Sequence, residues 1–208
     1  MGCQMRKKSN LIFLVCFIAA FSILFASYAT KAIAGPTGAA EIIKTTVDKV
    51  KITVVSEKSK ISEAALDAKL HDIIAPVFDF KEMARRSLAA NWEQASVTEQ
   101  AEFVNLFSKL LSDNYIKKIR ENVQKSDFTV AKEVSTGAES VLVSTSVFFE
   151  GKDAVIDYRL RSKDNTWKVY DVVIENIGLV SNYRSEFGAI VDKEGISGLL
   201  KKLREKSK

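Results

Sequence analysis

One acidic residue stands in an apolar segment where it could take part in proton transfer. Asp171 lies within residues 166–175, which have the alternating pattern of a strand. A carboxylate in an apolar cavity can serve as the base of an isomerase, with Tyr158 or Tyr170 beside it, because burial raises its pKa. The alternative, which we favour, is an ion pair with Arg159 or Arg161 on a neighbouring strand.

Few other residues could form a catalytic or metal site. His71 is the only histidine, and it lies in a predicted amphipathic helix, so we expect a packing or surface role for it. Asp79 and Glu82 have the spacing of a helix cap, and Asp153, four residues before Asp157, lies in a predicted turn. The sequence contains no P-loop, dinucleotide-binding, zinc-protease or serine-hydrolase motif. We therefore expect that the protein is not an enzyme and that it has no catalytic residue, no metal and no cofactor.

The first 34 residues have the organisation of a secretory signal peptide. Basic residues at 6–8 precede an uncharged apolar run over 11–27, and Ala-Ile-Ala at 32–34 is an A-x-A cleavage site. We expect cleavage after Ala34, which leaves residues 35–208 as an exported chain. The alternative is a retained membrane anchor, because the apolar run lies at the short end of the about 17 to 25 residues that span a bilayer.

Much of the positive charge lies in this leader. The sequence carries 31 basic and 26 acidic residues, and its formal charge of +5 suggests an anionic partner such as nucleic acid. The leader holds four basic residues and no acidic one, so the mature chain has a charge of about +1 and we expect no nucleic-acid partner. Cys3 and Cys16, the only cysteines, also lie in the leader, so the mature chain has no disulfide or thiol chemistry.

Apolar residues recur at helical spacing in the first half of the mature chain. The spacing predicts helices over 40–57 and 62–77, and Asp79 is placed to cap a third, short helix. Residues 96–99, Ser-Val-Thr-Glu, have the sequence of a capping box. A long helix is therefore expected to begin there and to continue to about Asn122.

Beyond that helix the apolar period changes from 3.6 to 2, which is typical of strands. The connecting segments are too short for crossovers, so the sheet should be an antiparallel meander. The expected strands cover residues 128–134, 140–149, 154–162 and 166–175.

The fourth strand carries apolar residues on both faces, so we expect the sheet to be partly covered on both sides. One face carries Tyr170, Val172 and Ile174, and the other carries Trp167, Val169, Asp171 and Val173. Helical spacing returns at Leu179, stops at Gly195 and resumes at Ile196. The order of helices, sheet and helices predicts one α+β domain over 35–208, with a four-stranded twisted antiparallel sheet packed against helices.

Two stretches of the chain carry longer residue patterns. The first consists of residues 77–88, 91–96, Phe103, Phe107 and 110–111, and the second of residues 157–160, 167–172, 177–180, 183–184, Phe187 and 195–199. In residue types, order and spacing they resemble the MlaC family, also called toluene-tolerance auxiliary proteins. The resemblance covers about residues 40–203 and therefore almost all of the mature chain.

This resemblance implies a periplasmic phospholipid carrier. Such a carrier moves lipid between an outer-membrane lipoprotein–porin complex and an inner-membrane ABC transporter complex with its MCE-domain protein, which maintains the lipid asymmetry of the outer membrane. The implied fold is a nuclear-transport-factor-2-like cone, with acyl chains in an apolar cavity between sheet and helices. Phospholipid is then the cargo, and the alternative cargo is another lipid such as a hopanoid.

The sequence departs from the family pattern at two places. Ala89 or Ala90 stands where the family commonly has glycine, and residues 175–178 read Glu-Asn-Ile-Gly where the family usually has Glu-Gly-Val-Ser. The second departure lies near the expected cavity wall, so it bears on lipid preference more than on fold.

The apolar faces and the resemblance together give the expected lining of this cavity. The lining residues are Val77, Phe80, Met83, Trp92, Phe103, Phe107, Val147, Phe149, Tyr158, Val172, Ile174, Ile177 and Leu179. Ile177 is the preferred probe, because it follows the last strand and should lie near the cavity mouth. Arg85, Arg86 and Arg184 are candidates to contact a lipid head group, and the alternative is that they form solvated helix faces.

Overall fold

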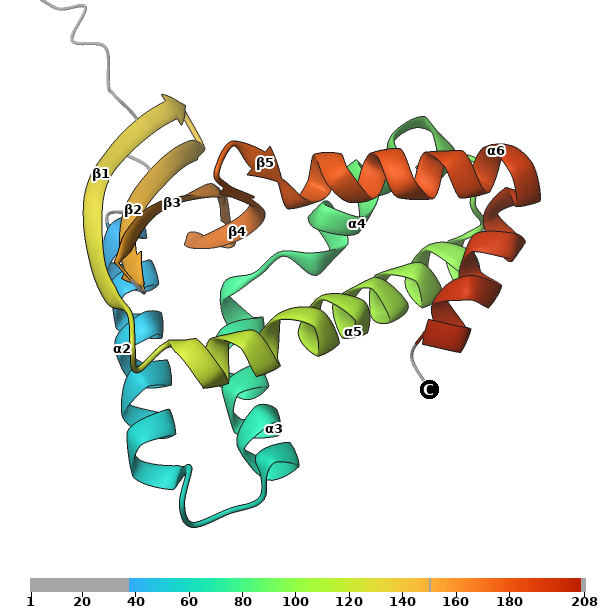
Figure 1. Ribbon diagram of the computed structural model, residues 1–208. Helices are drawn as coiled ribbons and strands as arrows, with labels where there is room; N and C mark the ends of the chain where they lie inside the picture. Colours follow the sequence, from blue (N-terminus) through green and yellow to red (C-terminus); the bar gives the residue numbers. More distant parts are fainter. Residues whose placement is uncertain (1–37, 150, 207–208) are drawn as a thin grey trace, which may run out of the picture. The chain divides into compact units, whose positions relative to one another are not determined.

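The computed structural model describes residues 38–149 and 151–206, which lie in a compact unit that runs from Gly35 to Lys208 (Figure 1). The leader predicted at residues 1–34 and its cleavage site lie outside the described residues. The helices are α2 (Ala39–Glu57), α3 (Glu63–Ile74), α4 (Phe80–Leu88), α5 (Val97–Asn122) and α6 (Leu179–Lys206), with short 3₁₀ helices η1 (Ala75–Val77) and η2 (Ala89–Trp92). None of the helices within the described ranges is long and apolar enough to cross a membrane.

Side-chain caps begin α4 and α5 at the positions that the sequence predicts. The carboxylate of Asp79 accepts a hydrogen bond from the backbone N–H of Glu82 at 3.1 Å, which caps α4. Ser96 and Glu99 form the predicted capping box of α5, because each side chain accepts a hydrogen bond from the other residue's backbone N–H. The capping interpretation of Asp79 and Glu82 is therefore confirmed.

The sheet is an antiparallel meander, as predicted. Its strands are β1 (Asp127–Gly137), β2 (Ser140–Phe149), β3 (Lys152–Lys163), β4 (Thr166–Ile174) and β5 (Ile177–Gly178), and they pair in chain order. The α+β class is confirmed. The number of strands is five and not four, because β4 turns back at Glu175 and Asn176, both at positive φ, and β5 then pairs with its end.

The predicted faces of β4 are wrong beyond Val169. Arg159 pairs with Asp171 and Leu160 with Val169, so Tyr170 is an extra residue without a partner on β3, a β-bulge. The extra residue shifts the in–out alternation of the side chains by one position. Apolar residues before and after the bulge therefore lie on the same face of β4. These residues share one buried cluster and are Trp167, Val169, Val172 and Ile174.

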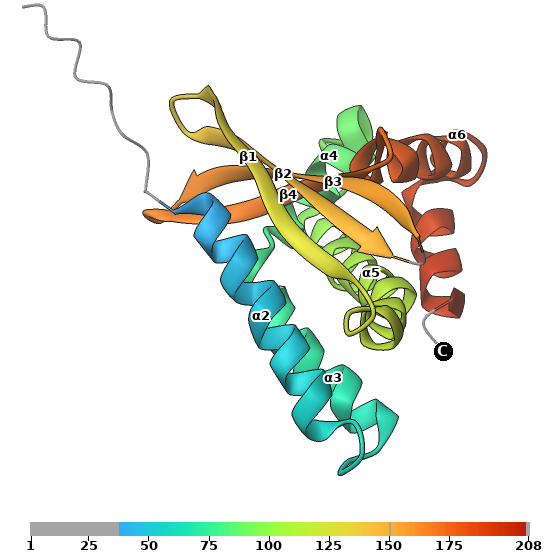
Figure 2. The ribbon, with the colours of Figure 1, turned by 60° about the vertical axis from the view of Figure 1, so that its left-hand side comes forward.

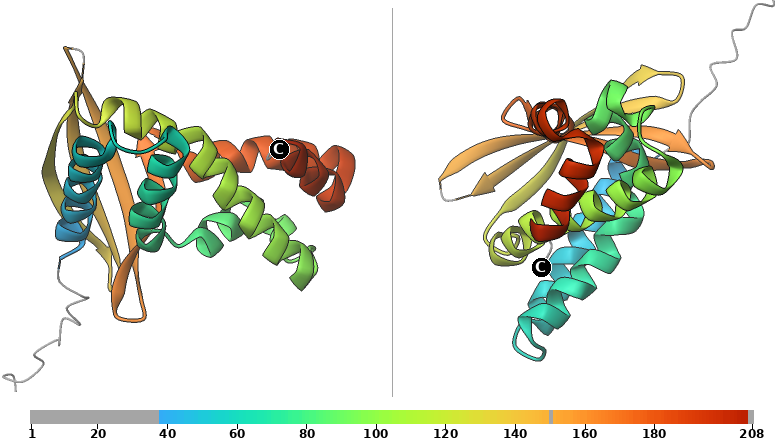
Figure 3. Two further views of the ribbon diagram at one scale, coloured as in Figure 1. Left: turned by 90° about the horizontal axis from the view of Figure 1, so that it is seen from below. Right: turned by 90° about the vertical axis from the view of Figure 1, so that its right-hand side faces the viewer.

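The helices cover the sheet unevenly. α2 contacts β1 and β2, and α4 and α6 contact β4, whereas α5 contacts the other helices α3, α4 and α6. Figure 2 shows α2 and α3 side by side, and Figure 3 shows α5 crossing below the sheet. At Gly195, whose φ is 69°, α6 turns sharply, which confirms the predicted interruption (Figure 1).

Three apolar clusters result from this arrangement. The first joins α4, α5 and α6, the second lies on the inner face of the sheet and the start of α2, and the third joins α2, α3 and the end of α5. The inner face is the one that carries Val143, Tyr158 and Val172. The functional site lies where these clusters meet.

Candidate functional site

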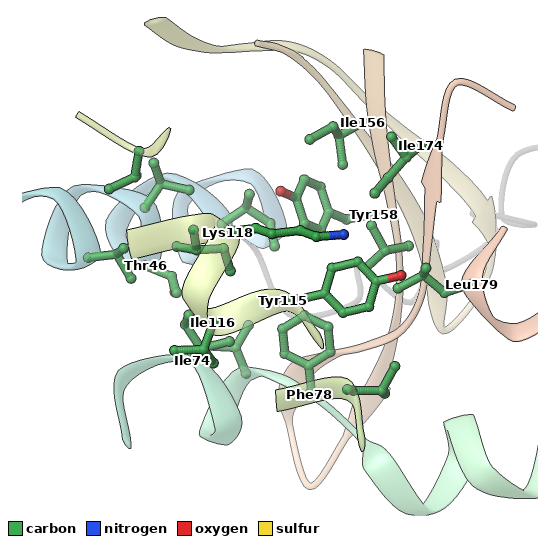
Figure 4. A pocket seen from close by; sticks show the side chains of 18 of the residues that line it. Thr46, Ile74, Phe78, Tyr115, Ile116, Lys118, Ile156, Tyr158, Ile174 and Leu179 are labelled. Atoms are coloured by element: carbon green, nitrogen blue, oxygen red, sulfur yellow. The ribbon is translucent and has the colours of Figure 1, made fainter. Parts of the chain in front are cut away.

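A cavity of about 590 Å³ lies between the inner face of the sheet and the helices. Its volume is within the about 300 to 1,000 Å³ typical of small-molecule sites. The lining is predominantly aliphatic and aromatic, and Figure 4 shows side chains from both walls. Lining residues include Ile43, Val47 and Val50 from α2, Ile74 from α3, Phe78 from the α3–α4 connection, Leu111, Tyr115, Ile116 and Ile119 from α5, and Ile156 from β3.

The structure brings together much of the lining that the sequence predicts. The predicted residues that face this cavity are Val77, Phe80, Met83, Val147, Tyr158, Val172, Ile174 and Leu179. Phe149 ends β2, and its side chain lies outside the described part of the structure. That the eight residues contact a bound molecule remains a prediction.

Three predicted lining residues belong to the core instead. Trp92, Phe103 and Phe107 are buried in the cluster of α4, α5 and α6, and the rings of Phe103 and Phe107 contact Phe187 edge-on with centroids 5.4 and 5.5 Å away. The correction follows from the length of α5. Phe103 lies about 24 Å from Ile119 along the helix axis, so the first half of α5 packs on α6 and only its second half reaches the cavity.

Ile177 is also not among the lining residues. It follows the two-residue turn of Glu175 and Asn176, and its side chain is 64% exposed. The tight turn presents it to solvent, so its proposed role as the preferred probe of the cavity is corrected. This turn is one of the places where the sequence departs from the family pattern.

The residues of α2 and of the second half of α5 were not expected in the lining. Ile43, Val47, Tyr115, Ile116 and Ile119 show helical spacing, which indicates one buried face and not what that face contacts. The same period arises whether the face packs on a neighbouring helix or opens on a cavity. The sequence contained a signal for burial and none for the cavity.

Two tyrosines and one lysine bring polar atoms to the cavity. Burial raises the pKa of Tyr158 to about 12, and burial together with Tyr183 raises the pKa of Tyr115, so both hydroxyls stay protonated near neutral pH. The ammonium of Lys118 lies 5.6 Å from the centroid of the Tyr115 ring. Figure 4 shows the Lys118 side chain extending between these two tyrosines.

A second, polar groove of about 430 Å³ lies on the outer face of the sheet. Arg159 and Asp171 line it and form an ion pair at 3.1 Å, which confirms the favoured interpretation of Asp171. The other oxygen of Asp171 accepts a hydrogen bond from the backbone N–H of Val180, at the start of α6, at 3.1 Å. Tyr158 faces the apolar cavity, so Asp171 and Tyr158 do not share a site.

The predicted head-group arginines do not reach the apolar cavity. Arg86 and Arg184 line the polar groove, and Arg86 lies over the Tyr170 ring at 4.3 Å. Arg85 and Arg86 both bind the buried carboxylate of Glu82, at 2.8 and 2.7 Å. Burial alone would raise the pKa of Glu82, but the hydrogen bonds from these arginines outweigh it and lower that pKa to about 2. We assign these arginines to the helix surface and its ion pairs.

The described part of the chain holds no group of three or more His, Cys, Asp and Glu side chains placed to bind a metal ion. His71 lines one side of the cavity, and its Nδ1 lies 3.7 Å from a carboxylate oxygen of Asp72. The arrangement is therefore suited to holding an apolar molecule, with few polar contacts.

Comparison with known proteins agrees with this geometry. The family model described as MlaC protein matches residues 44–205. None of the curated proteins compared with the chain matches it. A solved structure of a phospholipid-binding protein from Ralstonia solanacearum, in complex with a phospholipid, is similar over 80% of this chain and 95% of that chain, with 26% identity and a TM-score of 0.73. Because the family match spans most of the sequence, the chain belongs to the MlaC family.

Proposed function

We propose that this protein is a periplasmic carrier that holds the acyl chains of a phospholipid between its sheet and helices. The observation that carries the proposal is the cavity of about 590 Å³, which has a mostly apolar lining from the helices α2 to α6 and the sheet. The similar protein from Ralstonia solanacearum, which was solved with a phospholipid, supports it.

The physical task explains why the cavity is apolar. Exposing hydrocarbon to water costs about 0.8 kcal/mol per methylene, so two chains of about fifteen methylenes each carry about 24 kcal/mol. A protein that moves lipid through water must cover that surface during the whole transfer. An apolar cavity does this without a reacting group.

We further propose that the carrier exchanges lipid with an inner-membrane ABC transporter complex that has an MCE-domain protein, and with an outer-membrane lipoprotein–porin complex. Membership of the MlaC family and the export signal that the sequence predicts at residues 1–34 support this cellular role. Cleavage at the predicted site would leave a chain with a charge of about +1, for which we expect only weak electrostatic attraction to anionic membranes. The outcome would be the maintenance of outer-membrane lipid asymmetry.

A carrier also accounts for Asp171 better than an enzyme does. Its carboxylate binds Arg159 and the backbone N–H of Val180, so both oxygens have structural partners. These contacts lie on the outer face of the sheet, away from the apolar cavity. A proton-abstracting base would need a free oxygen that faces the cavity.

The test is the chemical identity of the molecule that copurifies with the protein. Full-length chain is expressed and exported, the protein is purified without detergent, and an organic extract is analysed by thin-layer chromatography and mass spectrometry. We expect about one glycerophospholipid per protein. Detection of a hopanoid would support a lipid carrier but show that its cargo is not a phospholipid. An extract without lipid would contradict the proposal.

A further inference from the structure

Lys118 is the one lysine, arginine, aspartate or glutamate among the described residues that line the cavity. It lies on α5, three residues after Tyr115, and its ammonium is 5.6 Å from the centroid of that ring. Figure 4 shows the ammonium among the lining side chains, between Tyr115 and Tyr158. Lys118 is also exposed to solvent, so a charged and accessible side chain lines a mostly apolar cavity.

Within the described residues this ammonium has no carboxylate partner and no hydrogen bond. Other lysines of α5 do have such partners: Lys109 binds Asp113 at 2.8 Å, and Lys117 lies 3.9 Å from Glu121. The lining contains no Asp or Glu in the described part of the chain, so the cavity itself supplies no counter-charge. The Tyr115 ring offers only a weak cation–π contact at this distance.

Loading the cavity changes the surroundings of this charge. Acyl chains in the cavity cover the side of this exposed lysine that faces the lining, and removing water from an unpaired charge is unfavourable. A ligand that brings its own anion removes this penalty and adds a charge-assisted hydrogen bond. A neutral lipid cannot do so.

We propose that Lys118 pairs with the phosphate of the lipid cargo and so selects anionic amphiphiles over neutral lipids. The inference rests on the proposed function and extends it to the choice of cargo. It places the polar end of the lipid beside the second half of α5, and it disfavours an uncharged polycyclic lipid such as a hopanoid. Carboxylates of fatty acids share the anionic chemistry, so the experiment must separate them from phosphates.

The test compares Lys118→Met, which keeps the apolar stem and removes the charge, with Lys118→Arg and with Lys117→Met. Lys117 is an exposed neighbour outside the cavity lining and serves as the matched control. Delipidated protein is incubated with vesicles that contain equal amounts of phosphatidylglycerol, oleic acid and dioleoylglycerol. The protein is then recovered, and the three bound lipids are quantified by mass spectrometry.

We expect the wild type to prefer phosphatidylglycerol to dioleoylglycerol and Lys118→Met to lower that ratio about tenfold, since hydrogen bonds to charged groups are among the stronger ones. Lys118→Arg and Lys117→Met should keep the wild-type ratio. An unchanged ratio in a fully loaded Lys118→Met would overturn the inference and leave the proposed function intact. An equal loss of all three lipids, or a loss confined to oleic acid, would also overturn it, and a wild type that takes up no lipid would overturn both.

Discussion

Arg159 and Asp171 face each other across β3 and β4, and their side chains form an ion pair at 3.1 Å on the outer face of the sheet. The bulge at Tyr170 turns Asp171 to this face. There the Asp171 carboxylate also accepts a hydrogen bond from the backbone N–H of Val180. The carboxylate thus ties β4 to the start of α6, where the helix dipole favours a negative charge. Its role is structural.

Asp171→Asn should therefore weaken the fold and leave cargo binding unchanged. The variant loses the charge that pairs with Arg159, and we expect the free energy of unfolding to fall by about 1 to 3 kcal/mol. Urea denaturation measures the stability, and lipid extraction measures the cargo. Loss of cargo from a folded Asp171→Asn would show that this residue acts at the lipid site.

The buried carboxylate of Glu82 should make the protein less stable at acidic pH. The pKa of Glu82 is lowered from its ordinary value of 4.5 to about 2, because hydrogen bonds from Arg85 and Arg86 outweigh the effect of burial. Glu82 binds a proton more readily in the unfolded chain than in the folded protein. The stabilisation that its charge provides is therefore present above pH 4.5 and is lost as the pH falls toward 2. Glu82→Gln should lower the free energy of unfolding at pH 7 by about 2 kcal/mol.

Urea denaturation from pH 7 to pH 2.5 checks this prediction. The difference between wild type and Glu82→Gln should shrink as the pH falls below 4.5, because protonation of Glu82 then stabilises the unfolded wild type relative to the folded one. Glu41→Gln, at an exposed position of α2, is the control and should lower stability little at any pH. A constant difference between wild type and Glu82→Gln over the whole range would be inconsistent with a lowered pKa of Glu82.

The core and the cavity should respond differently to truncation. Phe107 is fully buried between α5 and α6, so Phe107→Ala should lower the free energy of unfolding by about 3 to 5 kcal/mol. Ile156 faces the existing cavity, and Ile156→Ala should cost only about 1 kcal/mol because few packing contacts are lost. Chemical denaturation of both variants checks the assignment, and equal losses would contradict it.

The parts of the fold that local residues determine could be predicted from the sequence. The capping box at Ser96 and Glu99 needs only four consecutive residues, and the turn at Gly195 follows from a residue that tolerates positive φ. The bulge at Tyr170 could not be predicted, since it is defined by the register between β3 and β4. It depends on residues of two strands together.

The same distinction applies to the site. The sequence indicated that Phe107 and Tyr158 are buried, but not that one packs in a core and the other faces a cavity. Lys118 was missed because a lysine on a helix is ordinarily solvated, and Lys118 is indeed exposed; that it also lines the cavity depends on how α5 lies against the sheet. Ile177 was misplaced because its exposure depends on the tight turn before it.

Blocking the cavity tests most directly the central claim that it holds phospholipid. Ala154 lines the cavity, whereas the next residue, Val155, lies on the outer face of β3 and is 52% exposed, so Ala154→Trp and Val155→Trp place the same side chain on opposite sides of the strand. The measurement is the number of phospholipids that copurify per folded protein. We predict that Ala154→Trp retains less than about a tenth of the wild-type lipid and that Val155→Trp retains all of it. Full occupancy in a folded Ala154→Trp would contradict the account.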